Sequence, residues 1–189
     1  MKYFDRYLRD RRIDQVVRRI PPGARVLDVG CHDGALFRAL GPALREGVGI
    51  DAALAGELSG PGYHLIPGSF PEDLPDDCGQ FDAIAMAAVF EHIPTDQQAG
   101  VVTACWKRLV DGGQVILTVP SPLVDPILDV LAVVRVIDGI EHHQHFGFQP
   151  AHLAPLFTSK GFVLAQRRTF QLGLNNLFVF TKPVGAQSG

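Results

Sequence analysis

Cysteine is scarce in this chain, and long apolar runs are missing. The 189 residues include three cysteines, Cys31, Cys78 and Cys105, whose spacing indicates neither a disulfide framework nor a zinc knuckle. No stretch approaches the roughly 18 to 20 consecutive apolar residues that a membrane-spanning helix needs. Residues 1–6 also lack the apolar segment of a signal peptide. We therefore expect reduced thiols, a cytoplasmic protein and no membrane span.

An excess of charge of one sign is also missing. The formal net charge of −3 argues against a strongly electrostatic nucleic-acid binder, so no nucleic-acid partner is expected. Basic residues nevertheless gather in the first segment, at Lys2, Arg6, Arg9, Arg11, Arg12, Arg18 and Arg19. A solvated face of an opening helix explains them, and a docking surface for an anionic lipid or polymer is the alternative.

The length of the chain sets the domain count. With 47% hydrophobic and 20% charged residues, it is long enough to bury a substantial core and too short for two full-sized α/β domains. We predict one domain over residues 1–189 that opens with a helix over 1–20. No internal repeat is present, and an insertion over 121–148 is the only candidate subdomain.

Short apolar segments alternate with segments of helical spacing. Ala24–Val29, a helix over 34–40 and Gly47–Ile50 form a βαβ pattern. Further strands are expected at Tyr63–Ile66, Phe81–Met86, Gln114–Val119, Phe162–Phe170 and Asn176–Thr181, with helices over about 95–109 and from near Pro150. Nearly continuous apolar strands are typical of a sheet covered by helices on both faces. The prediction is a Rossmann-like three-layer α/β sandwich, with a mostly parallel seven-stranded sheet and an antiparallel C-terminal edge strand.

The turn after the first strand has the features of a ligand site. Gly30 lets a ligand approach the backbone, and Gly34 lets the following helix pack closely. An open α/β sheet presents its crevice at this position. Asp28 suits a ligand that carries an ammonium group, whereas a dinucleotide site would have Gly-x-Gly-x-x-Gly and room for a pyrophosphate.

A second carboxylate follows the second strand. Asp51 lies where an acid can accept charge-assisted hydrogen bonds from both hydroxyls of a ribose. The alternative is that Asp51 caps a helix that begins at Ala52. Asp28 and Asp51 together favour a nucleoside that carries an amino-acid tail.

From about Arg25 to Lys182 the chain resembles the class I S-adenosylmethionine-dependent methyltransferases. The segments that carry the resemblance are Val26–Gly34, Gly49–Asp51, Gly68–Pro75, Phe81–Ile93 and Leu109–Leu117. The resemblance implies S-adenosylmethionine as cofactor and S-adenosylhomocysteine as product. It also implies that Asp28 and Gly30 hold the methionine end and Asp51 the ribose. By the same resemblance, Ser69 and Phe70 hold the adenine, and Ala87 and Ala88 back the sulfonium.

Two residues depart from the family pattern. His32 stands where the family usually has glycine, either as a tolerated substitution or as a side chain that reaches the cofactor or acceptor. Ser69 stands where an acid commonly contacts the adenine amino group, and its hydroxyl makes that contact more weakly.

The acceptor side is less clearly marked. An oxygen, nitrogen or acidic carbon acceptor must lose a proton, and histidine suits that task near neutral pH. The candidates are His92, which is equally well explained by packing, and His143 and His145 in the insertion. A metal reading is disfavoured because the spacing of the later histidines fits no strong ligand pattern. The apolar segment 123–137 could pack under a lid, line a lipophilic acceptor pocket or form a homodimer seam.

Three functions follow from these patterns. The favoured one is methyl transfer to a small-molecule acceptor at oxygen, nitrogen or carbon. A cofactor-binding module without its own turnover is suggested by His32, Ser69 and the lack of an obligatory catalytic residue. A nicotinamide-dependent oxidoreductase is disfavoured because the glycine pattern is incomplete.

Overall fold

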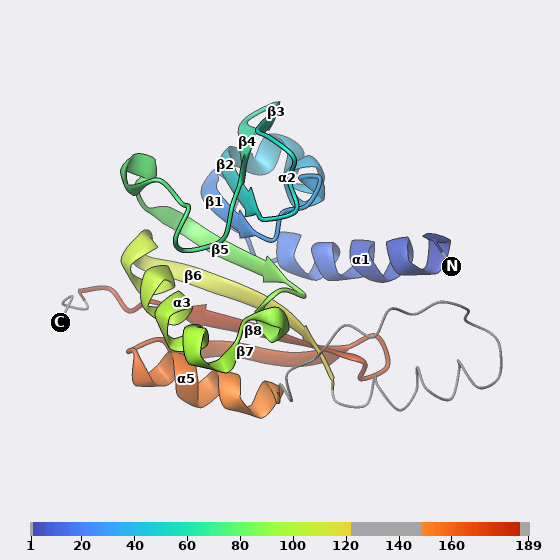
Figure 1. The fold of residues 1–189 in the computed structure, drawn as a ribbon. Helices are drawn as coiled ribbons and strands as arrows, with labels where there is room; N and C mark the ends of the chain where they lie inside the picture. Colours follow the sequence, from blue (N-terminus) through green and yellow to red (C-terminus); the bar gives the residue numbers. More distant parts are fainter. Residues whose placement is uncertain (1, 122–148, 186–189) are drawn as a thin grey trace.

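The computed structural model describes residues 2–121 and 149–185 and contains one mixed sheet (Figure 1). Its strands are β1 (Ala24–Val29), β2 (Leu44–Asp51), β3 (Leu58–Gly60), β4 (Tyr63–Pro67), β5 (Phe81–Ala87), β6 (Leu109–Pro120), β7 (Val163–Phe170) and β8 (Asn175–Thr181). Its helices are α1 (Lys2–Val17), α2 (Ala35–Leu40), α3 (Thr95–Arg108) and α5 (Leu153–Ser159). The 3-10 turns include η3 (Phe90–His92), which directly follows β5.

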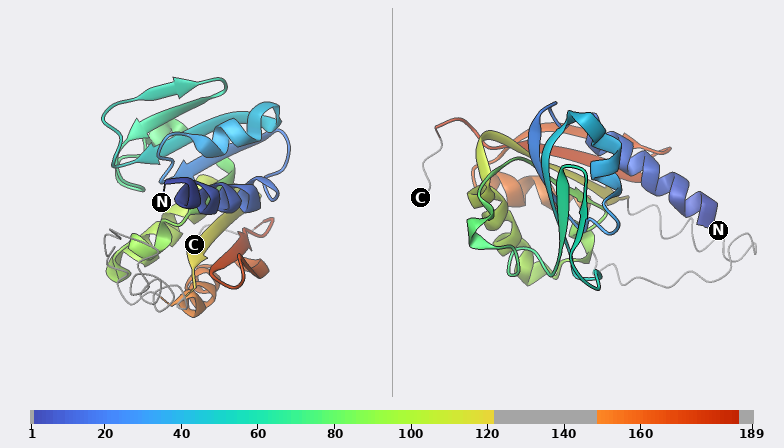
Figure 2. Two further views of the ribbon diagram at one scale, coloured as in Figure 1. Left: turned by 90° about the vertical axis from the view of Figure 1, so that its right-hand side faces the viewer. Right: turned by 90° about the horizontal axis from the view of Figure 1, so that it is seen from above.

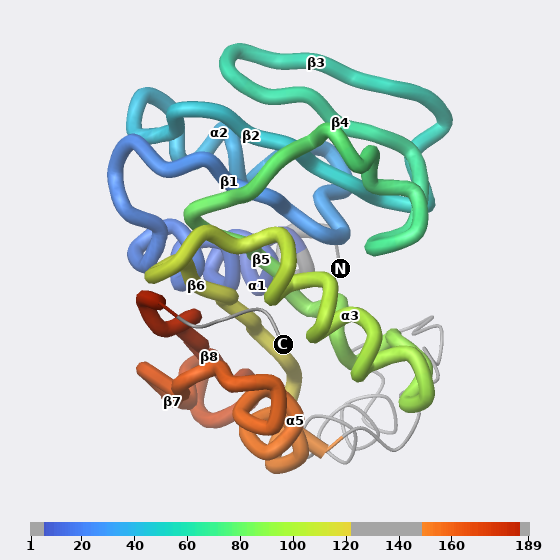
Figure 3. The backbone as a smooth tube through the Cα atoms, turned by 90° about the vertical axis from the view of Figure 1, so that its left-hand side faces the viewer, coloured from blue at the N-terminus to red at the C-terminus, as the bar shows by residue number. Residues whose placement is uncertain are grey.

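The strand order confirms a mostly parallel sheet with antiparallel C-terminal strands. The order is β3-β4-β2-β1-β5-β6-β8-β7, and Figure 3 shows it from one edge to the other. Strands β4, β2, β1, β5 and β6 are parallel neighbours, whereas β8 pairs antiparallel with both β6 and β7. All seven predicted strands are present, with ends shifted by a few residues.

The sheet has eight strands because β3 adds one at the edge. No helix begins at Ala52, so the helix-cap alternative for Asp51 is wrong. The chain instead folds back as β3, which pairs antiparallel with β4 between Leu58 and Leu65. Glycine and proline at positions 60–62 favour a tight turn there, which returns the chain antiparallel to itself.

Helices cover both faces of the sheet, as the right-hand view of Figure 2 shows. On one face α1 and α2 contribute Val16, Leu36 and Phe37 to a buried cluster. On the other face α3 and α5 bury Trp106 and Phe157 against the sheet. The three-layer prediction is therefore confirmed.

An aromatic cluster holds the turn after β5 in place. Phe157 of α5 stacks on Phe180 of β8, with ring centroids 4.3 Å apart and planes 9° apart. Phe90 of η3 is fully buried and packs against the same Phe157 ring, with the two ring centroids 5.8 Å apart. Because Phe90 is anchored on that face, its neighbour Glu91 has a defined position at the end of β5.

Two findings concern the segments that the sequence singled out. Among the described residues, no helix is both long enough and apolar enough to cross a membrane. The predicted apolar helix over 123–137 and the histidines His143 and His145 lie outside the described residues.

Candidate functional site

Two cavities meet at the edge where β1, β2, β4 and β5 end. The larger cavity, of about 460 Å³, is lined by α1, the turn after β1 and the end of β5. The smaller cavity, of about 320 Å³, is lined by the end of β2, the loop after β4 and residues after β5. Gly30 and His92 line both cavities. The two cavities therefore form one crevice along the carboxyl edge of the sheet, where open α/β sheets bind ligands.

The turn after β1 depends on left-handed backbone conformations. Gly30 has φ +75°, and a Cβ placed there would lie 2.3 Å from Cγ2 of Val89. His32 has φ 47°, a conformation that non-glycine residues adopt only at a cost. Its amide donates a hydrogen bond of 2.8 Å to Oδ2 of Asp51, and its side chain is 74% exposed. The backbone of His32 thus occupies the place of the usual glycine while its ring lies largely in solvent.

The two predicted carboxylates lie on neighbouring strands. Asp28 pairs with Gly49 in the sheet register, two residues before Asp51. Besides the His32 amide, the Asp51 carboxylate accepts the amide of Ala53 at 2.8 Å through Oδ1. Each oxygen of Asp51 accepts one of these bonds and retains a lone pair for a further donor.

Asp28 is the more strongly perturbed carboxyl. Its side chain lines the larger cavity but is only 4% exposed. Burial raises its pKa to about 8, and the negative charges of Asp51 and Asp33 add to this rise. A cation bound beside Asp28 would relieve both effects, so the site favours a positively charged group.

Helix α1 supplies arginines to the larger cavity. Arg6, Arg11 and Arg18 are exposed, as a solvated helix face predicts, but Arg9 and Arg12 line the cavity with Ile13 and Val16. An ion pair of 3.5 Å joins Arg9 to Asp33, and Nε of Arg9 is buried with no hydrogen-bond partner among the described residues. This role of Arg9 and Arg12 was not predicted, although the spacing 9, 12, 13 and 16 indicates one helical face.

The predicted adenine loop lines the smaller cavity. Ser69 and Phe70 are both part of its wall, and the Ser69 amide donates a hydrogen bond of 2.8 Å to Oδ2 of Asp73. The exposed Glu72 and nearby Gln97 also line this cavity. Glu72 is an acid at this end of the crevice that the sequence analysis did not identify.

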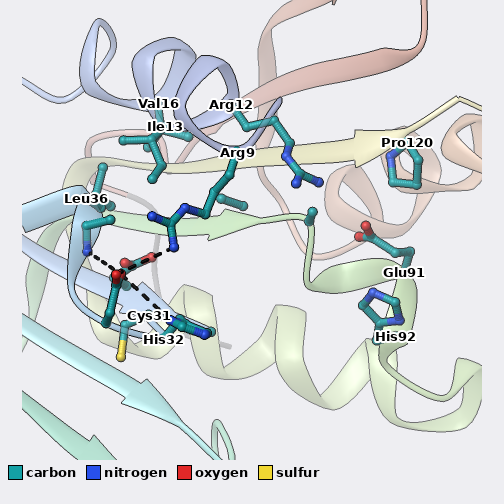
Figure 4. Close-up of a pocket in the computed structure, with 16 residues that line it drawn as sticks. Arg9, Arg12, Ile13, Val16, Cys31, His32, Leu36, Glu91, His92 and Pro120 are labelled. Atoms are coloured by element: carbon teal, nitrogen blue, oxygen red, sulfur yellow. Dashed lines mark hydrogen bonds and ion pairs between the residues drawn. The ribbon is translucent and has the colours of Figure 1, made fainter. Parts of the chain in front are cut away.

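The end of β5 forms the opposite wall of the larger cavity. Ala87 and Ala88 line it, and Ala88 has φ 60°, with its amide donating to the carbonyl of Thr118 at 2.8 Å. Such strained conformations concentrate at functional sites. Glu91 is 2% exposed, and burial raises its pKa to about 7, while a hydrogen bond from its own backbone and the positive charge of Arg12 act in the opposite direction. Figure 4 shows the side chains of Arg12 and Glu91 pointing toward each other across the cavity.

The candidate acid–base residues are only partly placed by the structure. His92 lies at the junction of the two cavities, beside Glu91. His143 and His145 remain predictions because they lie outside the described residues. In the part of the chain that is described, no three histidine, cysteine or acidic side chains come together as metal ligands.

Comparison with known proteins finds similar sequences and similar solved structures that cover most of this chain. A curated ubiquinone biosynthesis O-methyltransferase from Xylella fastidiosa is 33% identical over 156 residues, which cover 76% of this chain and 63% of the relative. The chain thus spans less than two thirds of the length of that relative. An O-methyltransferase family protein from Burkholderia thailandensis superimposes with a TM-score of 0.68 at 15% identity, over 95% of this chain and 57% of that one.

A further solved structure, magnesium protoporphyrin IX methyltransferase from Synechocystis with bound S-adenosylhomocysteine, matches with a TM-score of 0.61 at 18% identity, over 90% of this chain and 81% of that one. The family model described as a methyltransferase domain matches residues 1–166. The chain therefore belongs to the methyltransferase domain family, and its resemblance to class I S-adenosylmethionine-dependent methyltransferases is confirmed.

Proposed function

We propose that this protein binds S-adenosylmethionine along the crevice and transfers its methyl group to a hydroxyl group of a small-molecule acceptor. The observation that carries the proposal is the pair of carboxylates at neighbouring strand tips, with Asp28 in the larger cavity and Asp51 in the smaller. Buried, electrostatically crowded Asp28 suits the ammonium group of an amino-acid tail. Asp51, with lone pairs left on both oxygens, suits the two ribose hydroxyls.

The remaining walls of the crevice fit the same ligand. Arg9 offers a cation for the carboxylate of the methionine tail, beside Asp28 in the larger cavity. Ser69 and Phe70 offer a polar and an apolar surface for the adenine, with Glu72 as an acceptor for its amino group. When bound, the cofactor supplies a methyl group on a positively charged sulfur that leaves as a neutral thioether. The protein then has to align the acceptor and exclude water.

An oxygen acceptor is favoured over nitrogen or carbon because the matched relatives are named as O-methyltransferases. The insertion over 121–148 is proposed to complete the acceptor site. A homodimer through residues 123–137 and a location in the cytoplasm remain predictions. A single domain over 1–189 also remains a prediction.

Calorimetric titration with S-adenosylhomocysteine tests the proposal. Asp51→Ala should weaken binding by roughly 100-fold, since two charge-assisted hydrogen bonds are lost at about 1.5 kcal/mol or more each. Asp51→Asn should lose less, and Asp77→Ala, which changes an exposed aspartate, should bind normally. Unchanged binding in Asp51→Ala would refute the ribose assignment. Binding without release of S-adenosylhomocysteine from S-adenosylmethionine, over a panel of hydroxylated acceptors, would instead support the binding module without turnover.

A further inference from the structure

Glu91 presents a buried carboxyl oxygen that the protein does not satisfy. Oε2 of Glu91 is inaccessible to solvent and has no hydrogen-bond partner among the described residues. The residue is 2% exposed, yet it forms part of the wall of the larger cavity. The carboxyl accepts a hydrogen bond from the Glu91 backbone, but Oε2 takes no part in it. Buried polar atoms are nearly always hydrogen-bonded in folded proteins, so an unpaired oxygen at a cavity wall indicates that its partner is a ligand.

The position of Glu91 within the cavity indicates which ligand this is. Arg9 and Cys31 lie toward one end of the larger cavity in Figure 4, and Glu91 and Pro120 lie toward the other. Asp28 belongs to the first end, because the charge of Asp33, which pairs with Arg9, acts on its carboxyl. The proposed function places the methionine tail at the Asp28 end. The Glu91 end is then left for the molecule that receives the methyl group.

We propose that Glu91 is the general base of the reaction, which contacts the acceptor hydroxyl and takes its proton. The inference rests on the proposed function. In this step the O–H bond of the acceptor breaks and its electron pair stays on the acceptor oxygen. The proton forms a new O–H bond with the Glu91 carboxylate, so a hydroxyl and a carboxylate become an oxyanion and a carboxylic acid.

The surroundings of Glu91 suit a base that works near neutral pH. Burial raises the pKa of Glu91 to about 7, whereas an exposed glutamate is too weak a base for a hydroxyl group. Arg12 of α1 faces the carboxylate across the cavity and opposes this rise. The positive charge of Arg12 also favours an oxyanion formed beside it. His92 is the adjacent titratable group on η3, and Asp28 is another titratable residue that lines this cavity.

The test uses the full chain saturated with S-adenosylhomocysteine, and catechol as a minimal hydroxylated probe. Carbon-13 NMR of glutamate-labelled protein, assigned by difference from Glu91→Gln, should show one carboxyl that titrates near pH 7. Catechol should shift this titration, whereas 1,2-dimethoxybenzene, which has no hydroxyl proton to give, should not. A titration that catechol leaves unchanged would overturn the inference.

Turnover provides a second, independent readout. With S-adenosylmethionine and catechol, Glu91→Gln should lower kcat by about 100- to 10 000-fold and remove the rise of kcat/KM with pH. Glu91→Asp should restore part of the activity, and Glu57→Gln, a change at an exposed glutamate, should behave as wild type. A Glu91→Gln variant with normal kcat would also overturn the inference. If the wild type fails to bind S-adenosylhomocysteine, the proposed function itself fails; if it binds and Glu91 does not respond, only the role of Glu91 fails.

Discussion

The affinity for S-adenosylhomocysteine should depend on pH through a single proton on Asp28. Burial and the nearby charges of Asp51 and Asp33 raise the pKa of Asp28 to about 8, so the free protein holds this carboxyl protonated at neutral pH. An ammonium group binds the ionised carboxylate, so binding must release the proton. Affinity should therefore rise with pH until the pKa of Asp28 in the free protein is reached.

The size of the effect follows from the same pKa. The apparent dissociation constant is larger than the intrinsic one by the factor 1 + 10^(pKa − pH). With a pKa of about 8 this factor is about 100 at pH 6 and about 4 at pH 7.5. Binding should thus tighten by about 20-fold over this range, or about 1.8 kcal/mol.

Calorimetry at several pH values, in buffers of different ionisation enthalpy, measures both the affinity and the proton release. The matched control ligand is 5′-methylthioadenosine, which keeps the nucleoside but has no ammonium group, and its affinity should vary little with pH. Asp28→Asn should bind S-adenosylhomocysteine more weakly and without the pH dependence. The reasoning is refuted if wild-type affinity is flat between pH 6 and pH 7.5, or if Asp28→Asn retains the slope.

Three further predictions concern stability. Gly30→Ala places a Cβ against the Val89 side chain at a residue with positive φ. This substitution should lower the free energy of unfolding, measured by urea titration, by about 2–4 kcal/mol. A loss below about 0.5 kcal/mol would contradict the geometry. Phe157→Ala removes the ring at the centre of the aromatic cluster and should lower the free energy of unfolding by about 3–5 kcal/mol. The control Val163→Ala, at a half-exposed position, should lower it by less than about 1 kcal/mol. Equal losses in the two variants would refute the assigned core. The Glu91 carboxyl holds its proton more tightly when folded, so wild-type stability should fall as pH rises from about 4.5 to about 7. Asp28, with its own raised pKa, contributes to the same fall, so Glu91→Gln should remove only the Glu91 part. Relative to wild type, Glu91→Gln should gain up to about 3 kcal/mol between about pH 4.5 and pH 7, and a difference that does not change with pH would show that burial does not perturb this group.

Much of the fold follows from local patterns. Apolar segments such as Ala24–Val29 and Phe81–Met86 predict buried parallel strands, and the structure contains both. Because parallel strands end at one edge of a sheet, acids at the carboxyl ends of two neighbouring strands had to lie near the same edge. The edge strand β3 was not predictable in this way, because its three residues form too short a pattern to distinguish from a loop.

The βαβ order, the glycine turn and the carboxylates at the strand tips follow from local sequence, because each depends on residues within one or two neighbouring elements. The other side chains that line the crevice are set by how distant elements pack together. Arg9 reaches the cavity because α1 packs across the sheet edge near Asp33, far along the chain. Glu91 becomes a perturbed carboxyl with one unpaired oxygen because the folded chain excludes water from it. Burial and charge at a site are sums over such distant neighbours, and a local sequence pattern does not contain them.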